Sequence, residues 1–165
     1  MIRFTPWTTV VHAEDVDPEF PMYVYKLMPF SELPSRVGAQ DFFVDVIGQI
    51  VGVSQLAYVR MPTNTTDTPK QVTAFRDDRN TEMKIVLWGQ RVAEFEAQLV
   101  YDNGQNLPVI GVFVGLLMKS YNNDETLSRG SACRWYLNED IPEIDDSFER
   151  LGDDFPKNSM DIKWC

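Results

Sequence analysis

The sequence predicts an all-β fold, a five-stranded barrel with a helix between the third and fourth strands, an extended N-terminal segment and a short C-terminal helix. Three observations carry this prediction. Short apolar runs rich in Val, Ile and aromatic residues alternate with polar turns, which is typical of all-β folds. Residues 90–104 change to helical spacing in the middle of that series. Residues 141–152 return to helical spacing near the C-terminal end.

Length and composition are those of one globular domain. The chain has 165 residues, of which 44% are hydrophobic and 12% aromatic, enough to bury a core. No apolar run approaches the roughly 18 residues of a membrane span, and MIRFTPW lacks the apolar stretch of a signal peptide. Cys133 and Cys165 make no disulfide framework, so we expect free thiols in a reducing compartment and no membrane partner.

The acidic residues are concentrated in the two flanks of the chain. The formal net charge is −10. Residues 1–59 hold three Lys/Arg against seven Asp/Glu, residues 60–134 hold nine of each, and residues 135–165 hold three against nine. The balanced centre therefore leaves room for a local basic groove, although the whole chain is acidic.

The first half of the chain supplies a lead-in segment and three strands. Residues 1–40 contain five prolines and read as an extended segment with a turn or short helical piece at FSELPSR. The first strand is expected within residues 41–55, where Gly48 and Gly52 permit coiling or a bulge. Polar residues 61–70 predict a long exposed loop. The second and third strands are expected at residues 71–77 and 82–89.

The third strand and the following helix have clear periodicities. Alternation places Met83, Ile85 and Leu87 on one face of the strand and Lys84, Val86 and Trp88 on the other. The helix, residues 90–104, has Val92, Phe95 and Leu99 at helical spacing and ends at Asn103-Gly104.

The second half supplies two more strands and the C-terminal helix. Residues 107–121 and 126–137 are expected to form a hairpin around the turn NNDE, and Ile144, Phe148 and Leu151 have helical spacing. Three strands, a helix and a two-stranded hairpin is the order of an OB fold. We therefore expect a lead-in segment at 1–40, an OB-fold domain at 41–140, and a helix with an acidic tail that frays into a polar end at 141–165.

Several stretches, in this order, resemble one known family. The chain resembles the second DNA-binding OB domain of the large subunit of replication protein A, most closely its plant forms and their divergent relatives. The resemblance covers roughly residues 20–145 and rests on MYVYKLMPFSELPSR, FVDVIGQIVGV, EMKIVLWGQRVAEF, LLMKSYNNDETLS and YLNEDIPEI. The family's preceding OB domain and zinc-containing OB domain lie outside this match, so we expect a fragment or a shortened relative.

The resemblance implies single-stranded DNA binding with bases stacked on two aromatic rings. Trp88 matches the tryptophan of the LWG piece, and Tyr121 stands where many relatives have phenylalanine. Arg60 and Lys70 fall where the family has phosphate-binding residues, whereas Leu117 stands where some members have a basic residue. The resemblance also implies a nuclear location, a role in DNA replication, repair or recombination, and other replication protein A-type subunits as partners.

Physical reasoning adds two lysines to this site and an ordinary alternative for each residue. A sequence-tolerant site for single strands needs exposed flat rings and cations along the backbone path. Lys84 shares the strand face of Trp88, and Lys119 lies in the fourth strand. Trp88 could instead plug the barrel mouth, Tyr121 could cover a sheet edge, and surface lysines often serve solubility. Alternation opposite the core residues favours exposure of Trp88.

Nothing in the sequence predicts enzymatic chemistry, a cofactor or a metal. His12 is the only histidine, and there is no Gly-rich phosphate loop, paired-carboxylate arrangement or Cys-x-x-Cys. Asp77 and Asp78 lack a third ligand at useful spacing and read as a turn. Two functions remain: an OB domain that binds single-stranded DNA, or a protein-interaction module that has lost most nucleic-acid affinity.

The acidic tail has two readings of its own. It is either a solvated amphipathic helix that closes the barrel, or a surface for a partner that binds acidic helices, which could also compete with DNA for the basic groove.

Overall fold

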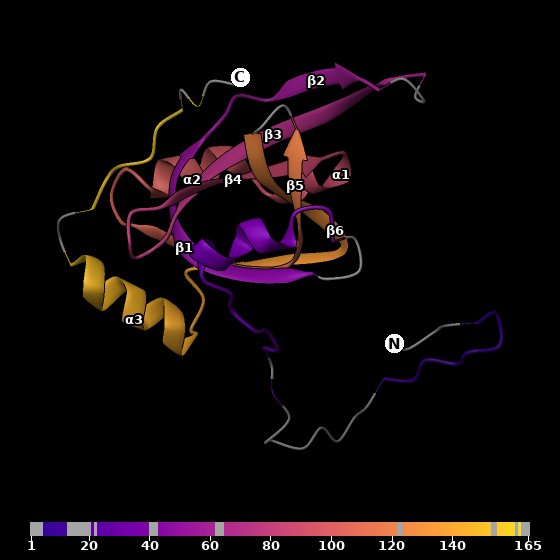
Figure 1. The fold of residues 1–165 in the computed structure, drawn as a ribbon, viewed down its shortest axis with the longest axis horizontal. Coiled ribbons are helices and arrows are strands. Elements are labelled where there is room, and N and C mark those ends of the chain that lie inside the picture. The colour runs from indigo at the N-terminus through magenta and orange to yellow at the C-terminus, as the bar shows by residue number, and fades with distance from the viewer. Residues whose placement is uncertain are drawn as a thin grey trace.

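The computed structural model describes residues 5–12, 21, 23–39, 43–61, 65–121, 124–152, 155–160 and 162. Its strands are β1 (Val44–Val53), β2 (Ala57–Arg60), β3 (Asp67–Arg76), β4 (Glu82–Trp88), β5 (Val109–Tyr121) and β6 (Asp124–Leu137). The helices are the 3-10 helix η1 (Phe30–Arg36) and the α-helices α1 (Gln90–Glu94), α2 (Ala97–Asn103) and α3 (Pro142–Leu151) (Figure 1).

Five of the strands form a closed circuit. β1 pairs antiparallel with β5 through residues 44–50 and with β3 through residues 49–53. β3 pairs antiparallel with β4, β4 parallel with β6, and β6 antiparallel with β5, which returns to β1. With helices between the third and fourth strands of this circuit, the arrangement is an OB fold. The predicted five-stranded barrel is confirmed.

β1 can serve two neighbours because it coils strongly. Its register with β3 shifts between Ile50 and Gly52, which is the signature of a bulge. At Gly48 an added Cβ would lie 2.4 Å from the carbonyl oxygen of Arg76. Only glycine permits this approach of β3, so Gly48 is needed where β1 passes from one partner strand to the other.

The segment after β1 is a two-stranded ribbon and not only a loop. β2 pairs antiparallel with the first four residues of β3, from Ala57↔Lys70 to Arg60↔Asp67. The predicted exposed loop at 61–70 was therefore too long, because residues 67–70 belong to β3. The polar side chains indicated a loop, but main-chain pairing is available to a ribbon with solvent on both sides.

The predicted single helix at 90–104 is two helices with a break. Glu96, between α1 and α2, has the left-handed backbone values φ 48° and ψ 50°. This break rotates α2 relative to α1, so that Val100 is buried while Leu99 is exposed. The prediction that Leu99 shares the buried face of Val92 and Phe95 was wrong for that reason.

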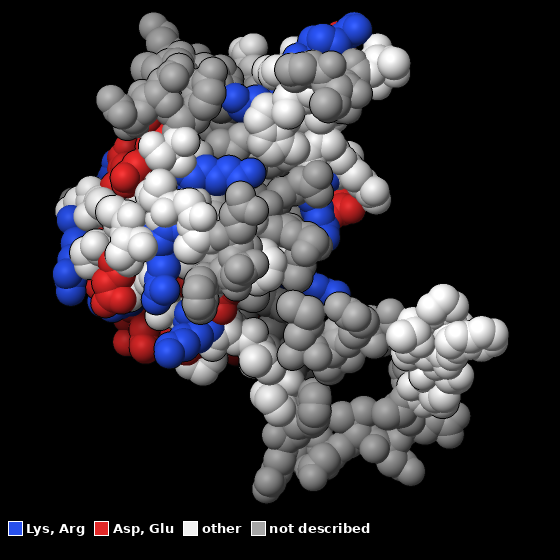
Figure 2. Space-filling model, turned by 45° about the vertical axis from the view of Figure 1, so that its right-hand side comes forward, with Lys and Arg blue, Asp and Glu red and all other residues white. Residues whose placement is uncertain are grey.

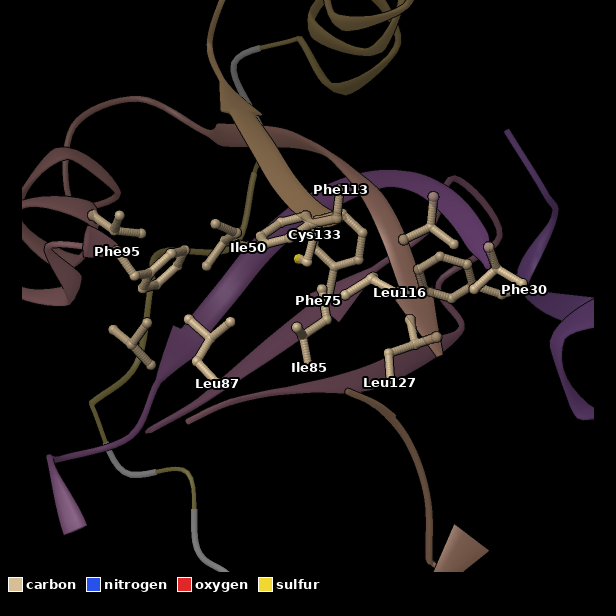
Figure 3. Packing of buried hydrophobic residues seen from close by; sticks show 14 of the residues in the cluster. Phe30, Ile50, Phe75, Ile85, Leu87, Phe95, Phe113, Leu116, Leu127 and Cys133 are labelled. Carbon is tan, nitrogen blue, oxygen red and sulfur yellow. The ribbon is translucent and has the colours of Figure 1, made fainter. Parts of the chain in front are cut away.

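Two apolar clusters hold the fold together. The main one fills the barrel, where Phe75 and Phe113 meet edge to face at 5.1 Å and Ile85 and Leu87 are fully buried (Figure 3). The inward face predicted for β4 is confirmed. The second cluster lies between α3 and the outer face of β5, where Ile144 packs with Ile110. Phe148 and Leu151 pack there too, which leaves Asp145, Asp146 and Glu149 exposed on α3.

The segment after α3 runs back along β1 (Figure 1). Ser159 N donates to Val51 O at 3.0 Å, and Val53 N donates to Ser159 O at 2.9 Å. Buried Asn158 donates through Nδ2 to Val100 O in α2. The prediction that this end frays was therefore wrong for residues 158 and 159. β5 stops pairing with β1 at Ile50, and the free backbone groups beyond it need partners.

None of the helices in the described ranges is long and apolar enough to cross a membrane.

Candidate nucleic-acid interface

The outward sides of β3, β4, β6 and β5 form one face of the sheet. Strand register places Lys70 beside Trp88, and Lys84 beside Thr126, which in turn lies beside Lys119. Residues directly opposite each other on paired strands have side chains on the same face. Between these two rows lie Val72, Val86, Ser128 and Leu117. The face is accessible at its two lysine rows and buried between them, where Val72 is 0%, Ser128 5% and Val86 7% exposed. We call this surface the lysine face; it consists of Lys70, Val72, Lys84, Val86, Trp88, Leu117, Lys119, Thr126 and Ser128.

Trp88 lies at the edge of the lysine face, at the end of β4. Its side chain is partly exposed. Gly89, with φ 62°, ends the strand and turns the chain into α1, and its N–H donates to Pro69 O at 2.9 Å. A left-handed residue here favours glycine. The sequence LWG thus fixes an aromatic ring at the last position of a barrel strand.

A lysine holds the ring of Trp88. The Lys70 Nζ lies 5.0 Å from the ring centroid, within the range of a cation–π contact, which is worth about 0.5–1 kcal/mol at exposed sites. Partial burial lowers the pKa of Lys70. Ring and cation therefore form one unit, with an aromatic surface for a base next to a positive charge for a phosphate.

The second row of the lysine face has a cation on each side of Thr126. Lys84 Nζ lies 3.0 Å from Asp124 Oδ2, and the two side chains are 32% and 44% exposed. A pair this exposed contributes about 0–1 kcal/mol, so a phosphate can replace the carboxylate. Lys119 is exposed on the neighbouring strand. Lys84 and Trp88 are four positions apart along β4, roughly 13 Å at strand spacing.

Arg60 does not join this surface. Because Ala57 is the residue opposite Lys70, alternation places Arg60 and Tyr58 on the other side of the β2–β3 ribbon. There the Arg60 Nε donates to Asp67 Oδ1 at 2.5 Å and its Nη1 donates to Thr65 O at 3.1 Å. The structure thus brings together four of the predicted site residues, Lys70, Lys84, Trp88 and Lys119, and leaves Arg60 elsewhere.

Tyr121 is placed only through its backbone. It pairs with Asp124 at the end of the β5–β6 hairpin, and its side chain lies outside the described part of the structure. Leu117 occupies the middle of the lysine face, beside Ser128, where the family resemblance pointed to a missing basic residue.

Sequence reasoning missed Asp124 and Thr126 as parts of this surface. Both come to Lys84 through the parallel pairing of β4 with β6, which no local pattern encodes. The polar turn NNDE was the only available signal.

Charges of both signs are mixed on the face of the molecule that Figure 2 shows. Figure 2 shows blue side chains between white and red ones on the viewed face, without a continuous basic area among the coloured residues. Nowhere in the described residues do three or more His, Cys, Asp or Glu side chains gather as a group able to hold a metal ion. The lysine face itself offers an aromatic ring and three lysines, one of which is paired with the carboxylate of Asp124.

Fold and surface together define an OB-fold domain. In sequence, the chain is 30% identical over 144 residues to the replication protein A 70 kDa DNA-binding subunit of Drosophila melanogaster. That alignment covers 86% of this chain and 22% of the fly protein. The chain thus spans about a fifth of the length of that relative.

The fold comparison points the same way. A solved structure of a replication protein A heterotrimer bound to single-stranded DNA superposes with a TM-score of 0.63 at 19% identity, over 84% of this chain and 31% of the matched chain. No family model matches the sequence. The chain is therefore an OB-fold domain similar to replication protein A in sequence and fold, and the predicted resemblance is confirmed at that level.

Proposed function

We propose that this chain binds single-stranded DNA through the lysine face. The observation that carries the proposal is the juxtaposition of Trp88 and Lys70 at one end of that face with Lys84 and Lys119 at the other. The names of its relatives support it, since one is a DNA-binding subunit and the other was solved with single-stranded DNA.

In the proposed mechanism the protein holds the strand by stacking and by charge and does no covalent chemistry. One base stacks on the exposed side of Trp88, and each such stack is worth roughly 1–3 kcal/mol. Lys70, Lys84 and Lys119 neutralise phosphates along the path, with Thr126 as a hydroxyl donor between the last two. Tyr121, at the end of the β5–β6 hairpin, supplies the second stacking ring. Arg60 contacts a phosphate only if the β2–β3 ribbon folds over the bound DNA.

The wider role proposed here follows the relatives. We place the chain in the nucleus, in DNA replication, repair or recombination, with replication protein A-type subunits as partners. A partner that binds the acidic side of α3 stays a prediction.

A titration of fluorescent oligo-dT at two salt concentrations tests the proposal. Binding should weaken with salt, and Trp88→Ala should raise Kd by about 5- to 150-fold, the equivalent of one lost stack. Tyr58→Ala is the matched control, because Tyr58 is an exposed ring (65%) on the other side of the ribbon; its Kd should stay unchanged. A folded protein without measurable binding at low salt would contradict the proposal.

The second candidate function is a protein-interaction module. Two observations favour it, the net charge of −10 and the apolar Leu117 in the middle of the lysine face. The same titration separates the two functions, because an interaction module would show no salt-dependent binding of oligo-dT and no effect of Trp88→Ala.

A further inference from the structure

An open groove lies beside the ribbon and the two barrel helices. It has a volume of about 990 Å³ and is bordered by the end of β1, the β2–β3 ribbon, Gly89, α1 and α2, and Met160 of the C-terminal segment. We call it the helix-side groove, and the residues that decide its chemistry are Leu56, Tyr58, Glu96, Leu99, Asp102 and Met160.

The groove has exposed apolar side chains that the fold leaves uncovered. Leu56 is 48% exposed, Tyr58 65% and Leu99 53%. Leu99 is exposed because of the backbone break at Glu96, a non-glycine residue at φ 48°. Such a conformation costs of order 1–3 kcal/mol and is kept where the surroundings enforce it. An apolar side chain turned outward by a strained residue points to a contact surface.

The walls of the groove are already ordered. Gln71 Nε2 donates to Ser54 O at 2.9 Å, and the Val72 N–H donates to Ser54 Oγ at 3.0 Å. At the far end the hydrogen bonds of Asn158 and Ser159 fix the segment that carries Met160. These hydrogen bonds hold two of the walls in place, which lowers the entropic cost of binding.

The charges of the groove select the kind of ligand. Its lining includes two carboxylates, Glu96 and Asp102, and no lysine or arginine. Asp102 Oδ1 accepts a hydrogen bond from Gln98, and within the described part of the chain no hydrogen bond or ion pair to Asp102 Oδ2 is seen, so this oxygen can face a cation. A polyanion would be repelled here, whereas an apolar segment flanked by lysine or arginine would match both features.

We propose that the helix-side groove docks a short amphipathic helix with a basic polar face, contributed by a partner protein. The apolar residues of that helix, one turn apart, pack between Leu56, Tyr58 and Leu99, and its lysines or arginines pair with Glu96 and Asp102. Tyr58 and Lys70 lie on opposite sides of the ribbon. Partner and DNA therefore occupy separate surfaces, and the inference does not depend on the proposed function.

The test uses a fluorescent model peptide of Leu and Lys spaced as an amphipathic helix, with a peptide of Leu and Glu as its counterpart. The Lys peptide should bind and the Glu peptide should not. Leu99→Ser should raise Kd at least about fivefold, as expected for a central contact, and Asp102→Asn should raise it less. Leu107→Ser is the matched control, because Leu107 is 64% exposed and outside the groove.

Because the protein is acidic, the Lys peptide could also bind non-specifically to carboxylates outside the groove, and the variants separate that result from docking in the groove. Equal affinity of the wild type, Leu99→Ser and Leu107→Ser would overturn the proposal, and so would absence of binding or binding of the Glu peptide. Trp88→Ala and Lys119→Ala, on the lysine face, should leave the peptide Kd unchanged, and a raised peptide Kd in both variants would overturn the separation of the two surfaces. Circular dichroism and thermal unfolding confirm that each exposed-site variant is folded.

Discussion

At the scale of single residues, the lysine face combines attraction and competition. Lys70 stands over the ring of Trp88, whereas Lys84 is paired with Asp124. A phosphate that approaches Lys84 must displace a carboxylate that lies 3.0 Å from it. Asp124 is thus expected to weaken DNA binding by occupying a cation and by repelling phosphate.

This competition predicts that substitutions of Asp124 and Lys84 change the Kd for oligo-dT in opposite directions. Asp124→Asn should lower the Kd for oligo-dT about two- to fivefold, since an exposed pair is worth up to about 1 kcal/mol, and Lys84→Ala should raise it. Glu139→Gln, at an exposed acid outside the lysine face, controls for net charge, and Lys26→Ala controls for loss of an exposed lysine elsewhere. Equal effects of Asp124→Asn and Glu139→Gln would mean that only total charge matters.

A second residue-scale prediction concerns pH. The Tyr25 hydroxyl donates to Glu143 Oε2 at 2.6 Å, and burial, with this hydrogen bond and the Glu143 charge, raises the pKa of Tyr25 to about 12. The folded protein therefore holds the phenolic proton more tightly than the unfolded chain. The associated stability is present below the unfolded pKa of about 10 and is lost as the pH rises towards 12.

Urea unfolding between pH 9 and 12, about the range of these pKa values, measures this effect. The unfolding free energy of the wild type should fall over that interval, and Tyr25→Phe should flatten the fall while lowering stability at neutral pH. Tyr58→Phe, at an exposed tyrosine without a carboxylate partner among the described hydrogen bonds, should leave the pH dependence as it is. An identical fall in both variants would contradict the assignment to Tyr25.

At the scale of elements, β1 is the strand on which the others depend. It pairs with β5, β3 and the C-terminal segment in turn. Its coil requires the close approach of Gly48 to Arg76 O. The sequence pattern predicted each barrel strand of the OB fold, because alternation and glycine position are local signals. It could not predict the break at Glu96 or the ribbon at β2, because main-chain pairing and tertiary packing decide both.

The coil of β1 gives an element-scale prediction. Gly48→Ala puts a methyl group against backbone at 2.4 Å, so β1 and β3 must separate, at a cost of about 1–3 kcal/mol or more. Urea unfolding at neutral pH should show that loss as a lower midpoint. Val24→Ala, at a strongly exposed position, should leave the midpoint nearly unchanged. A wild-type midpoint for Gly48→Ala would show that the strands can shift without cost.

At the scale of the whole molecule, the protein is acidic, yet the proposed ligand is a polyanion. A small basic surface on the protein is available to bind it. The lysine face holds three lysines. Under the proposed function, the ring of Trp88 rather than the net charge is expected to supply the specificity for unpaired bases. The site was predictable to the extent that strand alternation placed Trp88 and Lys84 on one face. The sequence could not predict that Arg60 lies away from this face or that Asp124 lies beside Lys84. Those positions depend on the pairing of β2 with β3 and of β4 with β6.

This surface sets the expected salt dependence. Each neutralised phosphate of a single strand contributes about −0.7 to the slope of log K against log salt, so three lysines give a slope of about −2. Removal of Lys119 should reduce the slope by about 0.7, and Lys26→Ala, outside the face, should not change it. A slope near zero with intact binding would show that stacking alone holds the strand.

The hydrogen bonds between Ser159 and β1 also bear on how the protein is made. Gln49 bonds to Pro156, 107 positions further along, so the first barrel strand leaves the ribosome long before its last neighbour exists. Until then the backbone N–H and C=O groups along that edge of β1 lack hydrogen-bond partners, and unpaired strand edges promote association with other chains. Nascent copies that carry only the first barrel strands should therefore depend on chaperones until residues 156–159 have been made and can bond to β1.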